Sequence, residues 1–187
     1  MLGDAAPALV LYEPGVAAAV EPVAEKLGIP HRWKIGAGGR RLVDWRDRAG
    51  LESALPLPEP DSLALLQYTG GTTGRSKGVN LTHRALAYNI SQREALMPSR
   101  LDVERILCVM PLFHVYASHC CLHTAVFARG TMVILPRYHP EETLRALIDE
   151  RITIFAGAPT IYTSLLNYEG FARADLSKIY YSVSGSA

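Results

Sequence analysis

The sequence has little of what several protein classes require. Only three of its 187 residues are cysteines, and two of these, Cys120 and Cys121, are adjacent. An odd, small number of cysteines does not suit a disulfide framework and favours a reducing, cytoplasmic environment. An excess of one charge is lacking too, because 19 basic residues stand against 18 acidic ones. That balance argues against a nucleic-acid groove or another face that binds polyanions.

Signals for membrane targeting are weak. The first residues, Met1 to Asp4, lack the basic start and the apolar core of a signal peptide. The stretch from Ile106 to Ala128 has no charged residue, and its length would span a bilayer. It contains Pro111 and several histidine, serine and threonine residues, however, and polar groups are costly in lipid. We therefore expect a buried strand and a helix there rather than a membrane span, and leave peripheral membrane contact open.

The remaining composition is that of a soluble globular protein, with 49% hydrophobic and 20% charged residues. The length suits one sizeable domain or two small ones. A proline-rich run from Leu55 to Pro60 predicts an extended linker, because a residue that precedes proline avoids the helical region. We place a boundary there, between a β/α portion with its linker, residues 1–60, and a second β/α portion, residues 61–187.

Apolar runs alternate with helical patterns along the chain. Strands are expected at residues 8–12, 32–35, 63–68, 103–110, 131–135, 152–155 and 179–183. Helices are expected at residues 14–27, 83–96 with Thr82 as N-cap, 116–128 with Gly130 at its end, 141–150 and 159–167. Repeated β-α-β units predict an α/β fold with a largely parallel sheet and helices on both of its faces.

The loop that follows the strand at residues 63–68 is the part of the sequence richest in chemistry. It reads TGGTTGRSKG from Thr69 to Gly78. Glycines let the backbone approach an anion closely, and successive amide groups can form an anion-binding nest. The hydroxyl groups and Lys77, one of only four lysines, add donors suited to phosphate. The alternative is an ordinary surface turn. A Walker A loop is excluded, because Gly78 follows Lys77.

At this point the sequence resembles a known family. Tyr68 to Val79 resembles the phosphate-binding signature of the adenylate-forming superfamily, which includes acyl-CoA synthetases, firefly luciferase and the adenylation domains of peptide synthetases. It is most similar to the form found in long-chain fatty-acid–CoA ligases, although Ser76 stands where many members have proline. Four further segments resemble later family motifs in the same order: residues 81–84, Pro111 to His114, Gly157 to Tyr162, and Ser184 to Ala187. The resemblance covers residues 63–187 well and the first sixty only loosely.

The resemblance implies a fragment of the large N-terminal domain of an enzyme that activates a fatty or other carboxylic acid. ATP and the acid would form acyl-AMP, with Mg²⁺ sharing the phosphate charge, and coenzyme A would then accept the acyl group. It implies that the ATP phosphates are held by Thr69, Gly70, Gly71, Thr72, Thr73, Gly74 and Lys77, and that the nucleotide also meets Gly185, Ser186 and Ala187. His114 would orient the carboxylate or donate to the adenylate. The acid would be lined by Tyr116, Gly157, Thr160 and Tyr162.

Several alternatives stay open. No Tyr-Gly-x-Thr-Glu segment, later ribose-binding acid or C-terminal catalytic lysine occurs, so we expect a piece truncated at both ends that does not turn over alone. An enzyme that adenylates aryl or amino acids, or a non-catalytic nucleotide-binding module, remains possible. His114 also fits a satisfied core histidine, and Thr160 an ordinary helix start. His119 and His123 are spaced like metal ligands, but Cys120 and Cys121 would diverge by about 100° on a helix, and no metal is predicted.

Overall fold

The computed structural model describes residues 1–36, 56–70 and 76–186. The chain divides into two compact units, Met1–His83 and Arg84–Ala187, and each is described by itself. The sequence-based boundary near residue 60 lies inside the first unit and stays a prediction. Among the described residues, no helix combines the length and the apolar character needed to cross a membrane.

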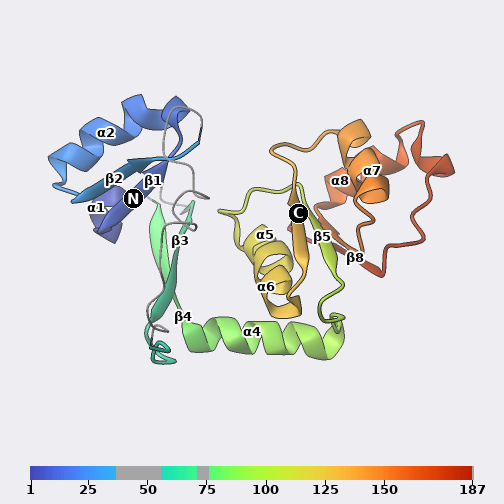
Figure 1. Ribbon diagram of the computed structural model, residues 1–187, viewed down its shortest axis with the longest axis horizontal. Coiled ribbons are helices and arrows are strands. Elements are labelled where there is room, and N and C mark those ends of the chain that lie inside the picture. Colours follow the sequence, from blue (N-terminus) through green and yellow to red (C-terminus); the bar gives the residue numbers. More distant parts are fainter. Residues whose placement is uncertain (37–55, 71–75, 187) are drawn as a thin grey trace. The chain divides into compact units, whose positions relative to one another are not determined.

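The first unit begins with a parallel pair of strands (Figure 1). Its elements are the short helix α1 (Leu2–Ala5), strand β1 (Leu9–Tyr12), the 3-10 turn η1 (Pro14–Val16), helix α2 (Ala17–Lys26) and strand β2 (His31–Lys34). Alternate residues of β1, Val10 and Tyr12, are buried against Ala24 and Ile29. Gly28 follows the end of α2 with a φ of +64°, a conformation that glycine adopts without strain. These elements confirm the predicted strand–helix–strand order.

A β-hairpin contributes the other two strands described in the first unit. Strand β3 (Leu63–Thr69) pairs with strand β4 (Lys77–Thr82) in antiparallel register, with Thr69 opposite Lys77. The loop expected from Thr69 to Gly78 is shorter than the sequence suggests, because Thr69 is the last residue of β3 and Lys77 and Gly78 are the first two residues of β4. The segment was mistaken for a loop because Gly78 and Asn80 interrupt its apolar pattern.

The second unit carries a four-stranded parallel sheet in the order β6-β5-β7-β8. Most of helix α4 (His83–Leu96) precedes it. The elements that follow are β5 (Arg105–Cys108), α5 (Val115–Ala117), the π-helix η2 (Ser118–His123), α6 (Thr124–Ala128), β6 (Thr131–Ile134), α7 (Pro140–Asp149), β7 (Ile154–Gly157), α8 (Pro159–Leu166), the 3-10 turn η3 (Phe171–Arg173) and β8 (Tyr181–Ser184).

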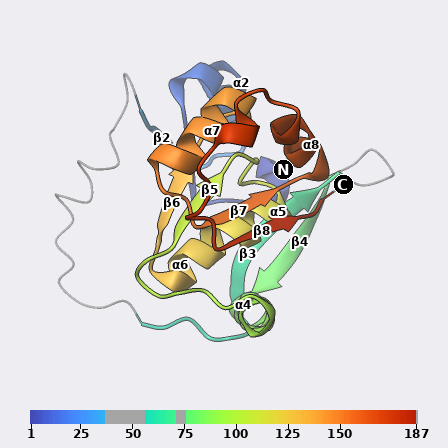
Figure 2. The ribbon, with the colours of Figure 1, turned by 90° about the vertical axis from the view of Figure 1, so that its right-hand side faces the viewer.

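Helices cover both faces of this sheet (Figures 1 and 2). Side chains of successive strand residues point to opposite faces. Leu107 and Phe155 therefore pack in one core cluster with residues of α7 and α8. Ile106, Cys108 and Ile154 pack in the other cluster with residues of α5, η2 and α6. The parallel sheet with two helical layers confirms the predicted fold class.

The helix predicted over residues 116–128 is present, but its middle is π-helical. The widened turn, Ser118–His123, lies between the α-helical segments α5 and α6. The helix ends at Ala128, and Arg129 takes the left-handed conformation with a φ of 50°. Gly130 comes next, and a Cβ there would lie 2.5 Å from the carbonyl oxygen of Glu104. Glycine is therefore required by the close approach of two backbones.

Candidate functional site

The second unit has a topological switch point at its central strands. The chain leaves β5 towards α5 on one face of the sheet, and leaves the neighbouring strand β7 towards α8 on the other face. In open α/β sheets, ligands bind in the crevice that such diverging connections leave outside the carboxyl ends of the strands. The segments Pro111 to His114 and Gly157 to Thr160 follow these two strands. The topology therefore brings two of the predicted motifs to one edge.

His114 lies at this edge as the N-cap of α5. Its Nδ1 accepts a hydrogen bond from the backbone N–H of Tyr116 at 3.2 Å, and its imidazole is exposed. A neutral imidazole whose Nδ1 accepts carries its proton on Nε2. The cap therefore fixes the orientation of the ring and leaves Nε2–H as a donor towards solvent.

Tyr116 and Tyr162 reach the same carbonyl from opposite faces of the sheet. The hydroxyl of Tyr116, from α5, lies 2.9 Å from the carbonyl oxygen of Val183, and that of Tyr162, from α8, lies 2.8 Å from it. A carbonyl oxygen has two lone pairs and can accept both bonds. The hydroxyl of Tyr162 also lies 2.9 Å from the carbonyl oxygen of Phe155, so its single proton serves two acceptors. This arrangement ties the end of β8 to both helical layers.

Both tyrosines are donors rather than bases. Burial raises the pKa of Tyr116 well above its ordinary value of 10.0. Burial also raises the pKa of Tyr162, to about 12, although its hydrogen bonds act in the opposite direction. Each phenol is therefore neutral near pH 7, where it can hold a carbonyl but cannot remove a proton.

Two glycines make room for these tyrosine rings. A Cβ at Gly157 would lie 3.2 Å from Cε2 of Tyr162, and a Cβ at Gly185 would lie 3.0 Å from Cε2 of Tyr116. The N–H of Gly185 donates to the carbonyl of Gly157 at 3.2 Å. The structure therefore brings together four of the predicted positions, namely Tyr116, Gly157, Tyr162 and Gly185.

The remaining predicted site residues of the second unit lie outside this group of tyrosines and glycines. Thr160 lies in the first turn of α8 and is exposed. Ser186 is exposed and has a φ of 62°. Ala187 lies outside the described residues. The carbonyls of Val183 and Phe155 could not be predicted from the sequence, since a backbone acceptor leaves no mark in the residue pattern.

The predicted phosphate loop belongs to the hairpin of the first unit. Thr69 ends β3 and Lys77 begins β4 directly opposite, and both residues are exposed. Residues paired in this way have Cβ atoms about 5 Å apart. The register thus puts the side chains of Thr69 and Lys77 at neighbouring positions on one face of the hairpin, and no atom of the described residues lies within 4 Å of a Cβ at Gly70. Gly71, Thr72, Thr73 and Gly74 lie outside the described residues.

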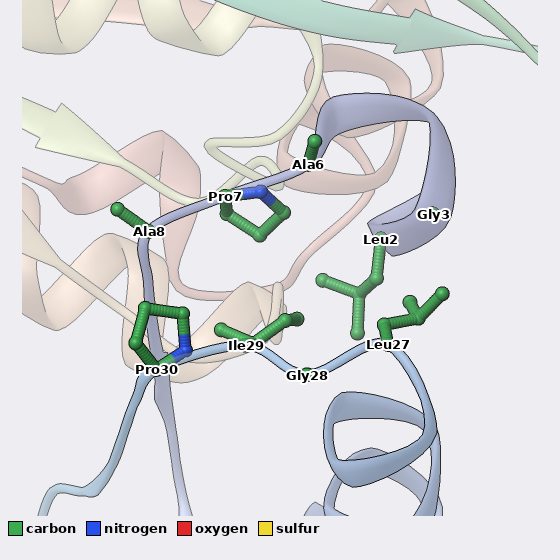
Figure 3. Close-up of a pocket in the computed structure, with 9 residues that line it drawn as sticks. All are labelled: Leu2, Gly3, Ala6, Pro7, Ala8, Leu27, Gly28, Ile29 and Pro30. Atoms are coloured by element: carbon green, nitrogen blue, oxygen red, sulfur yellow. The ribbon is translucent and has the colours of Figure 1, made fainter.

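Other parts of the described chain have fewer side chains suited to binding or catalysis. A hollow of about 290 Å³ lies between the N-terminal residues and the segment after α2 (Figure 3). The hollow is lined by apolar residues and glycines, namely Leu2, Gly3, Ala6, Pro7, Ala8, Leu27, Gly28, Ile29 and Pro30. None of these has a titratable side chain. In the residues that the structure covers, no group of three or more His, Cys, Asp or Glu is arranged to hold a metal ion.

Comparisons with known proteins agree with these features. Residues 1–187 match the sequence family described as AMP-binding enzyme. A long-chain-fatty-acid–CoA ligase of Bacillus subtilis is 41% identical over 131 residues, which are 70% of this chain and 23% of that protein. A 4-coumarate–CoA ligase of Oryza sativa is 31% identical over 159 residues, which are 81% of this chain and 30% of that protein.

Solved structures give the same result for the fold. The ATP-bound crystal structure of MatB from Rhodopseudomonas palustris is similar over the whole chain, with a TM-score of 0.85 and 31% identity. This match covers 36% of the MatB chain. The chain thus spans about a quarter to a third of the length of the proteins it resembles.

Proposed function

Because the chain belongs to the family of AMP-binding enzymes, we propose that it is part of an enzyme that activates a carboxylic acid with ATP and passes it to coenzyme A. The observation that carries this proposal is the family match over all 187 residues. It is supported by the exposed Thr69–Lys77 pair and by the polar groups at the carboxyl edge of the parallel sheet.

The hairpin supplies the groups for the phosphates. The donor set fits an anion, because Lys77 and Thr69 are both exposed and lie opposite each other. We propose that they hold the β- and γ-phosphates together with the backbone of Gly70, Gly71 and Gly74 and the hydroxyls of Thr72 and Thr73. Mg²⁺, when bound, supplies further neutralisation of the phosphate charge.

The sheet edge supplies the groups for the acid. His114 donates from Nε2 to the carboxylate, which keeps one of its oxygens aimed at the α-phosphate of ATP. The nucleophile is already ionised at pH 7, so positioning and charge stabilisation provide most of the rate. Tyr116, Gly157, Thr160 and Tyr162 line the acid, and Gly185, Ser186 and Ala187 meet the adenylate. The carboxylate forms a bond to the α-phosphorus, and pyrophosphate leaves.

The substrate class that we propose is a fatty acid. It is supported by the 41% identity to a long-chain-fatty-acid–CoA ligase. An aryl acid is the second candidate, because the 4-coumarate–CoA ligase matches a larger share of this chain at 31% identity. The small number of cysteines, all free, fits a reducing cytoplasmic location.

Nucleotide binding by the 187-residue chain tests the proposal. In calorimetric titrations with ATP and Mg²⁺, the variant Lys77→Ala is expected to bind ATP at least about tenfold more weakly, because a hydrogen bond to a charged group is lost. The matched control is Lys178→Ala, which removes another exposed lysine. Equal losses in both variants, or none in either, would contradict the assignment. We expect no pyrophosphate release from this chain alone with ATP and fatty acids.

A further inference from the structure

One buried cation has no part in the proposed reaction. Arg93 of α4 is only 7% exposed, and its guanidinium carbon lies 5.6 Å from the ring centroid of Tyr181. Its Nη1 donates to the carboxylate of Glu94 and to Oγ of Ser99, the latter at 3.0 Å. Its Nη2 is buried and has no hydrogen-bond partner in the described part of the chain. A buried donor left in this state is costly, so a partner is expected.

The partner that Arg93 lacks is not an anion. Glu94 already pairs with the guanidinium, and Ser99 donates to the same carboxylate from its backbone N–H at 2.7 Å and its hydroxyl at 2.9 Å. The nearby carboxylate of Glu104 is paired with Arg100. The local charges are therefore balanced, and a further negative charge in this buried place would be uncompensated.

Two more polar atoms in the same region lack partners. Nδ1 of His119, on the π-helix, and the hydroxyl of Tyr181 are both buried without a hydrogen bond within the described residues. Burial, His123 and Arg93 all lower the pKa of His119, so its imidazole is neutral near pH 7. Arg93 thus acts on His119 electrostatically and lies over the ring of Tyr181. A guanidinium donor, a phenol and a neutral imidazole suit an uncharged oxygen that both donates and accepts.

This polar group lies on the face of the sheet that also carries Tyr116. Tyr116, Cys120 and Tyr181 all pack against the core cluster beneath α5, η2 and α6. Tyr181 begins β8 and Gly185 follows its end, four residues further along, which corresponds to about 13 Å of strand. Tyr181, over which Arg93 lies, is therefore about 13 Å along β8 from the edge where the carboxylate of the acid is proposed to bind.

We propose that Arg93, Tyr181 and His119 form a polar subsite that takes an uncharged oxygen at the far end of the acid. Water fills this role in the free protein, and a hydroxyl group of the substrate replaces it in the complex. The inference rests on the proposed function, since it names the class of acid that the enzyme prefers: one with a hydroxyl group remote from its carboxylate. A plain fatty acid of equal length brings no oxygen to replace the water that its chain displaces.

A matched pair of acids tests the subsite in the 187-residue chain. We would titrate the chain with 10-hydroxydecanoate and with decanoate by calorimetry in the presence of ATP and Mg²⁺. The expected result is about tenfold tighter binding of the hydroxy acid, the lower end of the range for a hydrogen bond from a charged donor. Tyr181→Phe should reduce this ratio by about threefold, and Arg93→Met should abolish it.

The controls separate folding from recognition. Tyr88→Phe makes the same chemical change at an exposed position of α4 and should leave the ratio unchanged. If Arg93→Met does not fold, as judged by circular dichroism, Tyr181→Phe decides the question because it keeps the ring beneath the guanidinium. Equal affinities of the wild-type chain for the two acids overturn the inference. So does a crystal structure in which water stays on Arg93 with the hydroxy acid bound.

The experiments distinguish failure of the proposed function from failure of the polar subsite. A chain that does not bind ATP, or binds it independently of Lys77, contradicts the assignment of the phosphate loop. Retained, Lys77-dependent ATP binding together with no preference between the two acids contradicts only the polar subsite. ATP binding without binding of either acid also overturns the subsite, while it leaves the role of the hairpin intact.

Discussion

The two units differ in how they support the residues assigned to the site. In the second unit, two buried clusters enclose the sheet, and all four residues of β7 are buried. In the first unit, the only core cluster among the described residues contains four members, and no residue of β3 or β4 is fully buried. The sheet edge is thus held by packing on both faces, whereas the hairpin presents its polar groups from a thinly packed support. The comparison teaches that groups assigned to one reaction can lie on a well-packed sheet edge as well as on an exposed hairpin.

The largest expected difference between the units concerns core packing. Phe155→Ala should lower the free energy of unfolding by about 3–5 kcal/mol, because it empties a fully buried position between the sheet and two helices. Val10→Ala in the first unit should cost only about 1–2 kcal/mol. Urea denaturation followed by circular dichroism measures both. Leu166→Ala, at a side chain that is 66% exposed, is the control and should change little. A larger loss for Val10→Ala than for Phe155→Ala would reverse the comparison.

A second contrast uses one substitution in each unit. Gly130→Ala places a Cβ 2.5 Å from a backbone oxygen, whereas Gly78→Ala places one 2.9 Å from Cδ1 of Leu66, the end of a side chain that can turn away. We expect Gly130→Ala to destabilise by about 1–3 kcal/mol and Gly78→Ala by clearly less. Thermal denaturation checks this order, and equal melting temperatures would show that the backbone at Glu104 yields easily.

A third prediction concerns the stability of the fold at low pH. Burial opposes the charge of Glu104, but hydrogen bonds from Arg100 and Thr153 prevail and lower its pKa below the ordinary 4.5. A lowered pKa stabilises the fold above the unfolded-state value, and this contribution is lost as the pH falls from 4.5 through the folded-state value. Glu104→Gln should therefore cost about 1–2 kcal/mol at pH 7.

Urea titrations at several pH values test this behaviour. The stability difference between wild type and Glu104→Gln should shrink steadily below pH 4.5. A matched control is Asp102→Asn, whose carboxylate pairs with Arg129 where both side chains are more than half exposed. Exposed pairs contribute little, so this variant should hardly differ from wild type at any pH. A constant penalty for Glu104→Gln over the whole range would argue against a charged Glu104.

The smallest expected effect concerns the stability of the fold at high pH. The pKa of Tyr162 is raised to about 12, so its neutral form stabilises the fold below the ordinary pKa of 10.0, and this contribution is lost as the pH rises towards 12. Tyr162→Phe should cost about 1 kcal/mol near neutral pH, through the lost bonds to the carbonyls of Phe155 and Val183. Phenolate absorbance should show one tyrosine fewer titrating near pH 12 in the variant. The exposed Tyr88 offers the matched control, Tyr88→Phe.

Much of the fold could be predicted because local signals were strong. Pro140 and Pro159 begin the helices α7 and α8 at the expected places, and the apolar runs around Leu107 and Phe155 became central strands. Strand β4 escaped prediction because it is stabilised by pairing with β3, which its own polar and glycine residues do not indicate. The strand predicted at residues 152–155 instead spans Ile154–Gly157, since its bounds are set by its neighbours in the sheet.

The candidate site also has a part that the sequence predicted and a part that it could not predict. The positions of His114, Tyr116, Gly157 and Tyr162 followed from motif resemblance, and the topology brings their segments to one edge. The link between Tyr116, Tyr162 and the carbonyl of Val183 could not be foreseen, because it depends on the register of β8 against β7. Nor could the unpartnered atoms of Arg93 and Tyr181, since satisfaction of a polar group is a property of three-dimensional packing.

The π-helix η2 has a consequence for comparing this chain with its relatives. A π-helical turn closes its hydrogen bonds one residue later than an α-helical turn, so it accommodates one extra residue between α5 and α6. A relative with one residue fewer here could complete an ordinary α-helix while presenting the same flanking faces to the sheet. A single-residue gap in an alignment therefore belongs within Ser118–His123, where the fold can absorb it without rotating the segments on either side.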